Sequence, residues 1–258
     1  RSSSPCLNGT SPEARLSPAA ERPYHAGMKV FAILPWYDWA AVIWFFSAWS
    51  GYAWFARHRG ERYASLLQTT NRYRRYWMLQ ATSRDPRVLD GIITQTLSTS
   101  PSFFASTTII IIGGLLALLG TTDKATDFVR EIPFAVRTTM LVFDLKVLVL
   151  LSIFVYAFFR FSWSMRQYTF AALVIGSMPD PKDFDSGKFD RTHFADRAGT
   201  LLGMAAETFN DGVRAYYFAF AAIAWFFSPV AFALAAGMVV LILYSREYRS
   251  EVLHVLRD

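Results

Sequence analysis

The chain contains an apolar stretch, residues 139–159, that is long enough to cross a lipid bilayer and yet holds two charged side chains. A membrane-spanning helix needs about 20 apolar residues. Asp144 and Lys146 lie inside the stretch, and a charge near the bilayer centre costs about 2.5–3.5 kcal/mol on insertion scales. Such side chains usually face a protein interior or a water-filled cavity. The sequence therefore predicts a membrane protein that keeps charged groups between its helices.

The composition agrees with this class. Hydrophobic residues make up 53% of the 258 residues and charged residues 18%, whereas an ordinary soluble domain has about 25% charged residues. The 26 Lys and Arg residues outnumber the 20 Asp and Glu residues. They flank the apolar blocks, so membrane orientation accounts for them and nucleic-acid binding is not predicted. The single cysteine, Cys6, allows neither an intrachain disulfide nor a cysteine-based metal site.

The first 27 residues differ from the rest of the chain. They are rich in Ser, Pro, Ala and Glu and show no apolar periodicity, which predicts a disordered tail. Met28 then opens an apolar segment, so an alternative is that the tail lies upstream of the true start. Residues 28–258 are expected to form one membrane domain.

The predicted fold is an all-α polytopic membrane helix bundle with about five transmembrane helices. Ser100 and Pro101 are suited to the N-cap and the first turn of the second span. Gly113 and Ala117 in that span form a small pair that would let another helix approach closely, or are simply small residues. Pro229 predicts a tight hairpin between the last two spans; the alternative is one long kinked helix. The five spans are residues 39–56, 101–120, 139–159, 207–227 and 229–244.

The arginines predict the topology. Eight of them lie between residues 57 and 100, which places that loop in the cytoplasm. Five spans then leave the N-terminus outside the cell membrane and the C-terminus in the cytoplasm. Apolar residues at helical spacing in the loop, including residues 89–97 after the Asp85–Pro86 pair, predict amphipathic helices at the inner membrane surface.

A candidate intramembrane polar site consists of Asp144, Lys146 and Arg160. Lys146 and Arg160 are two heptads apart and fall near one stripe of the helix. Asp144 lies about 200° around the helix from Lys146, so these two side chains do not pair with each other. One interpretation is an ion or solute pathway. A second is a structural pair with polar groups of another helix, for which residues 210–214 are candidates. A third is that Asp144 is solvated near the outer surface.

A second candidate site, for charges or lipids, is expected at the inner membrane interface. The end of the fourth span supplies three polar residues, which predict a charge network in which Asp211 pairs with an arginine of the first cytoplasmic loop. The alternative is that Arg214 binds a lipid phosphate. The first cytoplasmic loop supplies an arginine cluster that predicts contacts with anionic lipids, worth about 1 kcal/mol per basic residue, rather than a substrate site. The six residues are Asn210, Asp211 and Arg214, and Arg72, Arg74 and Arg75.

Several runs of residues, taken in order, resemble the DUF599 family of multispan membrane proteins. The resemblance covers nearly all of residues 34–257 and implies an integral membrane protein. It implies no reaction and no catalytic residue, because the family has no assigned function. The runs are LPWYD at 34–38, NRYRRYWM at 71–78, FFASTT at 103–108, GGLLALL at 113–119, FSWSMRQY at 161–168, FNDGVRAYYF at 209–218 and LYSREY at 243–248.

The sequence lacks the motifs that name a reaction. It has no phosphate-binding loop, no HExxH and no GxSxG, and none of its four histidines falls in a predicted span, which argues against a bis-histidine haem. We therefore expect no cofactor and no metal. The predicted function is a structural or accessory membrane component that assembles with itself or with a larger complex. The alternative is a channel or transporter that uses Asp144 and Lys146.

Overall fold

The computed structural model describes residues 34–59, 65–121 and 139–257. Within them the secondary structure is helical, which confirms the predicted fold class. The predicted tail, residues 1–27, and the proposed start at Met28 lie outside the described residues. The principal helices in chain order are α2 (Trp36–Arg59), α3 (Leu66–Ala81), α4 (Val88–Leu119), α6 (Met140–Gly176), α8 (Arg191–Ile223) and α9 (Pro229–Tyr248). Three short ones accompany them: α7 (Pro181–Asp185), the 3₁₀ turn η1 (Ala224–Phe226) and α10 (Glu251–Val255).

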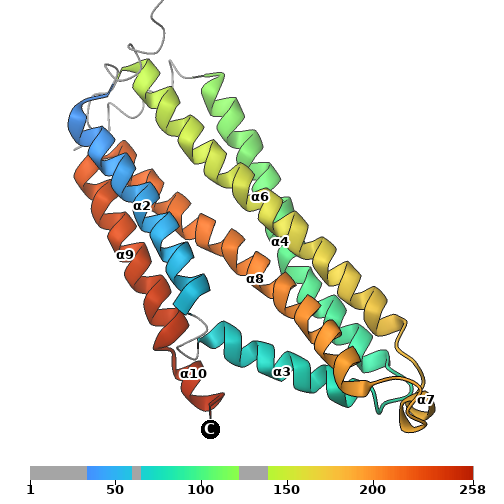
Figure 1. The fold of residues 1–258 in the computed structure, drawn as a ribbon. Helices are drawn as coiled ribbons and strands as arrows, with labels where there is room; N and C mark the ends of the chain where they lie inside the picture. The colour runs from blue at the N-terminus through green and yellow to red at the C-terminus, as the bar shows by residue number, and fades with distance from the viewer. Residues whose placement is uncertain (1–33, 60–64, 122–138, 258) are drawn as a thin grey trace, which may run out of the picture. The chain divides into compact units, whose positions relative to one another are not determined.

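Helix α8 packs against α3, α6, α9 and η1. It packs along α6, which in turn packs along α4, so these three long helices run side by side (Figure 1). On another side α8 contacts α9, and α9 contacts α2. Helix α3 lies across the first half of α8. Side chains that come from α2, α6 and α9 therefore meet along α8.

Helix ends are set by side-chain caps. The hydroxyl of Thr139 accepts a hydrogen bond from the backbone N–H of Val142 at the start of α6. Ser228 caps α9 in the same way by accepting from Ala231, and Pro229 occupies the first turn, where its missing N–H costs nothing. Helix α8 ends before this cap. The predicted hairpin at Pro229 is confirmed, and the long kinked helix is not formed.

Helix α4 differs from the prediction. Pro101 lies inside this 32-residue helix, so Ser100 is not its N-cap, and residues 89–97 are the beginning of α4 rather than a separate amphipathic helix. Asp85 does not cap it either, because the N-cap residue is Arg87. A proline inside a helix is tolerated in such a segment when neighbouring hydroxyls and packing compensate the backbone. The missing donor of Pro101 affects the Leu97 carbonyl, whereas Ser98 and Thr99 donate to the Gln95 carbonyl, so packing on α6 is the compensation that the structure shows.

Two glycines of α8 bring α3 close. A Cβ atom on Gly199 would lie 2.9 Å from Arg75 Cγ and 3.0 Å from Arg75 Cα, and one on Gly203 would lie 3.0 Å from the side-chain oxygen of Asn71. For Gly113 and Ala117 the sequence left two interpretations open, a close helix approach or simply small residues, and it did not single out the Gly199–Gly203 pair. Gly113 has open space around it in the described structure. The close helix contact is therefore made by α8 and not by α4.

Among the described residues, three segments are long and apolar enough to cross a membrane: α4, α6 and the helical segment Pro229–Val255 that contains α9. They hold the second, third and fifth predicted spans. The first predicted span lies in α2, whose 24 residues measure about 36 Å at 1.5 Å per residue. The fourth lies in the second half of α8 and in η1.

Candidate functional site

The carboxylate of Asp211 on α8 accepts hydrogen bonds from three arginines, which lie on three helices. Arg57 of α2 donates through Nη2 to Oδ2 at 3.2 Å, and Arg160 of α6 donates through Nη2 to the same oxygen. Arg214, one turn further along α8, donates through Nη1 to Oδ1 at 3.0 Å. We call these four residues the Asp211 cluster. It joins α2, α6 and α8.

The Asp211 cluster carries a surplus of positive charge. Three guanidinium groups face one carboxylate, so the formal charge of the cluster is two units positive. The Asp211 side chain is 4% exposed and that of Arg214 is 9% exposed, whereas Arg57 is 53% exposed. Arg214 also lies over the ring of Tyr52, 5.7 Å from the centroid. The surplus charge is therefore accessible on the side of Arg57 and enclosed on the side of Arg214.

The structure assigns partners to the predicted polar residues. Arg160 contacts Asp211, rather than grouping with Asp144 and Lys146 as we had expected. Asp211 was expected to pair with an arginine of the first cytoplasmic loop, and the structure identifies that arginine as Arg57. The sequence did not single out Arg57 among the eight arginines of the loop.

Lys146 belongs to a different polar group near η1. Its side chain is 3% exposed, and Nζ donates to the backbone carbonyl of Trp225 at 2.8 Å. The indole Nε1 of Trp225 in turn donates to Oδ1 of Asp38 on α2 at 2.7 Å. Lys146 also lies 5.4 Å from the Trp225 ring centroid. The partner of Lys146 is thus a backbone oxygen and not residues 210–214, while Asp144, on another side of α6, is half-buried.

The arginines of α3 do not form one cluster. Arg72 is exposed and donates to the hydroxyl of Tyr76 at 3.3 Å. Arg75 is also exposed and approaches Asp196 of α8, with Nε 4.0 Å from Oδ1. Arg74 is half-buried and donates to neutral oxygens of its own helix. Helical geometry sends the three side chains in different directions, so the predicted lipid site divides into separate positions.

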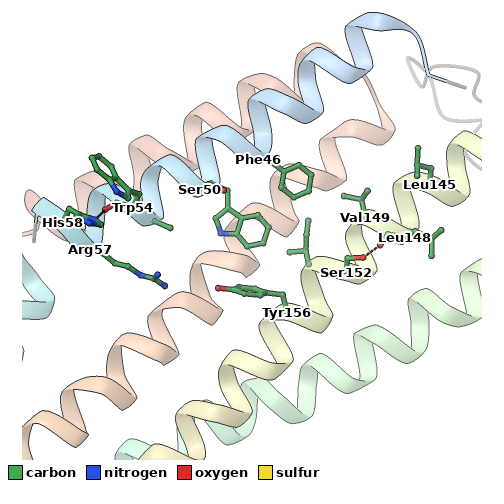
Figure 2. A pocket seen from close by; sticks show the side chains of 13 residues that line it. Phe46, Ser50, Trp54, Arg57, His58, Leu145, Leu148, Val149, Ser152 and Tyr156 are labelled. Carbon is green, nitrogen blue, oxygen red and sulfur yellow. Dashed lines mark hydrogen bonds between the residues drawn. The ribbon is translucent and has the colours of Figure 1, made fainter. Parts of the chain in front are cut away.

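A groove of about 800 Å³ lies between α2 and α6, beside the Asp211 cluster. Figure 2 shows Arg57 and His58 at one end and Leu145 at the opposite end, with the Tyr156 side chain between the helices. Most of the wall is apolar, as expected for a site that takes a hydrophobic ligand. The apolar lining includes Phe46, Trp49, Trp54, Leu145, Leu148, Val149 and Ile153.

Among the described residues, no group of three or more His, Cys, Asp or Glu side chains is arranged to hold a metal ion. The surplus positive charge of the Asp211 cluster can bind an anion, and the groove offers an apolar surface next to it. This combination suits a ligand with a negative head and a hydrophobic body.

Comparison with known proteins gives one match. A family model described as "Protein of unknown function, DUF599" matches residues 40–252. No curated protein and no solved structure matches the chain.

Proposed function

Because the chain belongs to the DUF599 family, whose description names no activity, we propose its function from its own geometry: it is an accessory membrane component that holds an anionic lipid between α2 and α6. The observation that carries this proposal is the position of the Asp211 cluster, with its surplus of positive charge, at one end of an apolar groove. The proposed topology is the predicted one, with five spans in the cell membrane and the basic end of α2 at the cytoplasmic face.

The head of the lipid is expected at Arg57. A guanidinium group carries five N–H donors and matches the geometry of a phosphate. Because half of the Arg57 side chain is accessible, it can keep its bond to Asp211 and bind a phosphate oxygen as well. His58 lines the same end of the groove. A phosphate bound at Arg57 would compensate the positive charge that the single carboxylate of Asp211 does not neutralise.

The acyl chain is expected along the aromatic wall. The volume of about 800 Å³ falls within the range of about 300–1,000 Å³ that is usual for small-molecule sites. Trp49 forms part of the wall and is itself held in place, since its ring stacks on Phe218 of α8 at 5.3 Å and meets Tyr156 edge-on at 5.6 Å. A wall held in this way can bind a chain without rearrangement.

The lipid would act as a structural component. By binding Arg57 it would strengthen the junction of α2, α6 and α8. Lys146 supports a packed interior over a solute pathway, because its ammonium group is buried against Trp225 and bonded to a backbone oxygen. Exposed apolar side chains on α4 and α9, among them Ile110 and Leu234, would face lipid tails or another membrane protein.

Native mass spectrometry of the protein released from mixed vesicles tests the proposal. With equal amounts of phosphatidylglycerol and phosphatidylcholine, we expect retained phosphatidylglycerol on the wild-type protein and its loss in Arg57→Gln. Arg72→Gln removes the same charge from α3, outside the groove, and should retain the lipid. Equal retention of both lipids, or an unchanged lipid mass in Arg57→Gln, would refute the proposal.

A further inference from the structure

A second hollow, of about 600 Å³, lies among α3, α4, α8 and α9. It is separate from the groove and the two share no lining residue. Both lie against the Asp211 cluster, however, because Arg57 lines the groove and Arg214 lines the hollow. We call this hollow the α3 cavity.

The α3 cavity is lined by three arginines and one carboxylate. Arg74 of α3, Arg214 of α8 and Arg246 of α9 line it together with Glu247 of α9. Because Arg214 is paired with Asp211, Arg74 and Arg246 leave one positive charge in excess of Glu247. Glu247 is engaged at the start of α3, where it accepts a hydrogen bond from the Leu67 backbone N–H at 3.2 Å. A carboxylate in the first turn of a helix is stabilised by the helix dipole. The negative charge of Glu247 therefore stabilises the start of α3.

Arg74 is held by uncharged partners. Its Nη1 donates to Oδ1 of Asn71 at 2.6 Å and to Oγ1 of Thr70 at 3.2 Å. Burial without a neighbouring carboxylate lowers the pKa of Arg74, because desolvation disfavours its charged form. An anion bound beside the guanidinium would offset this cost. Arg246 likewise donates to a neutral group, the hydroxyl of Tyr217, and lies 5.7 Å from that ring centroid.

The rest of the lining is largely apolar. It includes Leu97 of α4, Phe209 and Val213 of α8 and Leu243 of α9. Sites for small molecules combine a mostly hydrophobic wall with a few polar groups that fix the orientation of the ligand. The α3 cavity has this composition, with guanidinium groups as the polar part.

We propose that the α3 cavity is a binding site for a water-soluble organic phosphate that has an apolar body, with Arg74 and Arg246 on the phosphate and the leucine and phenylalanine side chains on the body. Guanidinium groups bind phosphate through paired N–H donors, and charge-assisted bonds of this kind are roughly twice as strong as neutral ones. The ligand differs from the lipid of the groove in entering from water.

The probe for the test is 4-methylumbelliferyl phosphate, an aryl phosphate whose binding can be followed by fluorescence anisotropy. The protein is measured in phosphatidylcholine nanodiscs. We expect saturable binding that the parent phenol, 4-methylumbelliferone, does not reproduce. Loss of one charge-assisted contact of about 1.5–3 kcal/mol should raise Kd at least about tenfold, and we expect this for both Arg74→Gln and Arg246→Gln.

The matched control is Arg72→Gln, which removes an exposed arginine from the same helix and should leave Kd unchanged. The lipid proposal is judged by the retained lipid mass and this one by the Kd of the probe, so the failure of one is distinguishable from the failure of the other. Replacing phosphatidylcholine by phosphatidylglycerol should not displace the probe; displacement would assign the cavity to a lipid headgroup and overturn the proposal.

The proposal would also be overturned by equal binding of the phenol and its phosphate, or by an unchanged Kd in Arg74→Gln. That variant should fold, because the hydrogen bonds that it loses lie within α3 and glutamine is a good helix former. A thermal unfolding curve close to that of the wild type confirms this before binding is measured.

Discussion

Replacing Asp211 by asparagine keeps the size of the side chain and removes the one negative charge of the Asp211 cluster. The three arginines should respond unequally, because their exposures differ. Arg57, at 53% exposed, can turn to water or to a lipid phosphate, and exposed ion pairs are worth about 0–1 kcal/mol. Arg214, at 9% exposed, has no such route.

The cost of the substitution is therefore set by the buried pair. Removing one partner of a buried ion pair destabilises a protein by about 3–5 kcal/mol, because a charge is left uncompensated. We expect Asp211→Asn to lower the free energy of unfolding by this amount. Replacing the buried pair by uncharged side chains is often close to neutral. The double variant Asp211→Asn with Arg214→Met should therefore recover most of the loss, and Asp211→Asn with Arg57→Met should not.

The assay is unfolding by sodium dodecyl sulfate in mixed micelles, followed by the fluorescence of the eight tryptophans. The two double variants are compared in the same micelles. The reasoning would be refuted if Asp211→Asn cost less than about 1 kcal/mol, which is the scale of an exposed pair. It would also be refuted if Arg57→Met rescued the stability as fully as Arg214→Met.

Three further outcomes are expected. Gly199→Ala should lower the free energy of unfolding by about 1–3 kcal/mol, because its Cβ meets the backbone of α3. Gly113→Ala lies in open space and should raise the free energy of unfolding by about 0.5–1 kcal/mol. A lower free energy of unfolding in both variants would contradict this contrast. In a Cys6→Ser background, Lys146→Cys should resist a water-soluble thiol reagent, since position 146 is buried, and rapid labelling would instead favour a solute pathway. Hydrogen bonds from Thr192 and His193 lower the pKa of Asp190, the N-cap of α8. The ionised cap should therefore stabilise the fold fully above the unfolded pKa of about 4, and this stabilisation should be lost as pH falls through the lower pKa of the folded state. The protection factors of the amides in the first turn of α8, which correct the exchange rates for the intrinsic effect of pH, should fall on acidification. Protection factors that are the same in Asp190→Ala as in the wild type would exclude that cause.

A local rule predicted the break before the last span. Pro229 marked the hairpin, and it occupies the first turn of α9 after the N-cap Ser228; the N-cap of α6, Thr139, was not predicted. The same rule failed at Ser100 and Pro101. There the helix continues through the polar run Ser-Thr-Ser-Pro-Ser at 98–102. Tertiary packing of α4 on α6 outweighs a local cost of about 3 kcal/mol.

The site was harder to predict than the fold because its members are distant in the sequence. Arg57 and Arg160 are 154 and 51 residues from Asp211, and no period or motif connects them. Lys146 illustrates a second limit, since its partner is a backbone carbonyl of Trp225. A carbonyl is present at every position and gives no compositional signal, so the charge was visible in the sequence and its partner was not.

The long sequence separations also fix an order of events during synthesis. Arg57 and Arg160 are made before Asp211, and Asp38 and Lys146 are made before Trp225, which supplies partners to both. A ribosome that has released only α2, α4 and α6 has therefore delivered polar groups whose partners do not yet exist. Until α8 and η1 are made, the side chains of Arg57, Arg160, Asp38 and Lys146 lack the partners that they have in the folded structure. The second half of α8 is thus the segment that completes the ion pairs of the earlier helices α2 and α6.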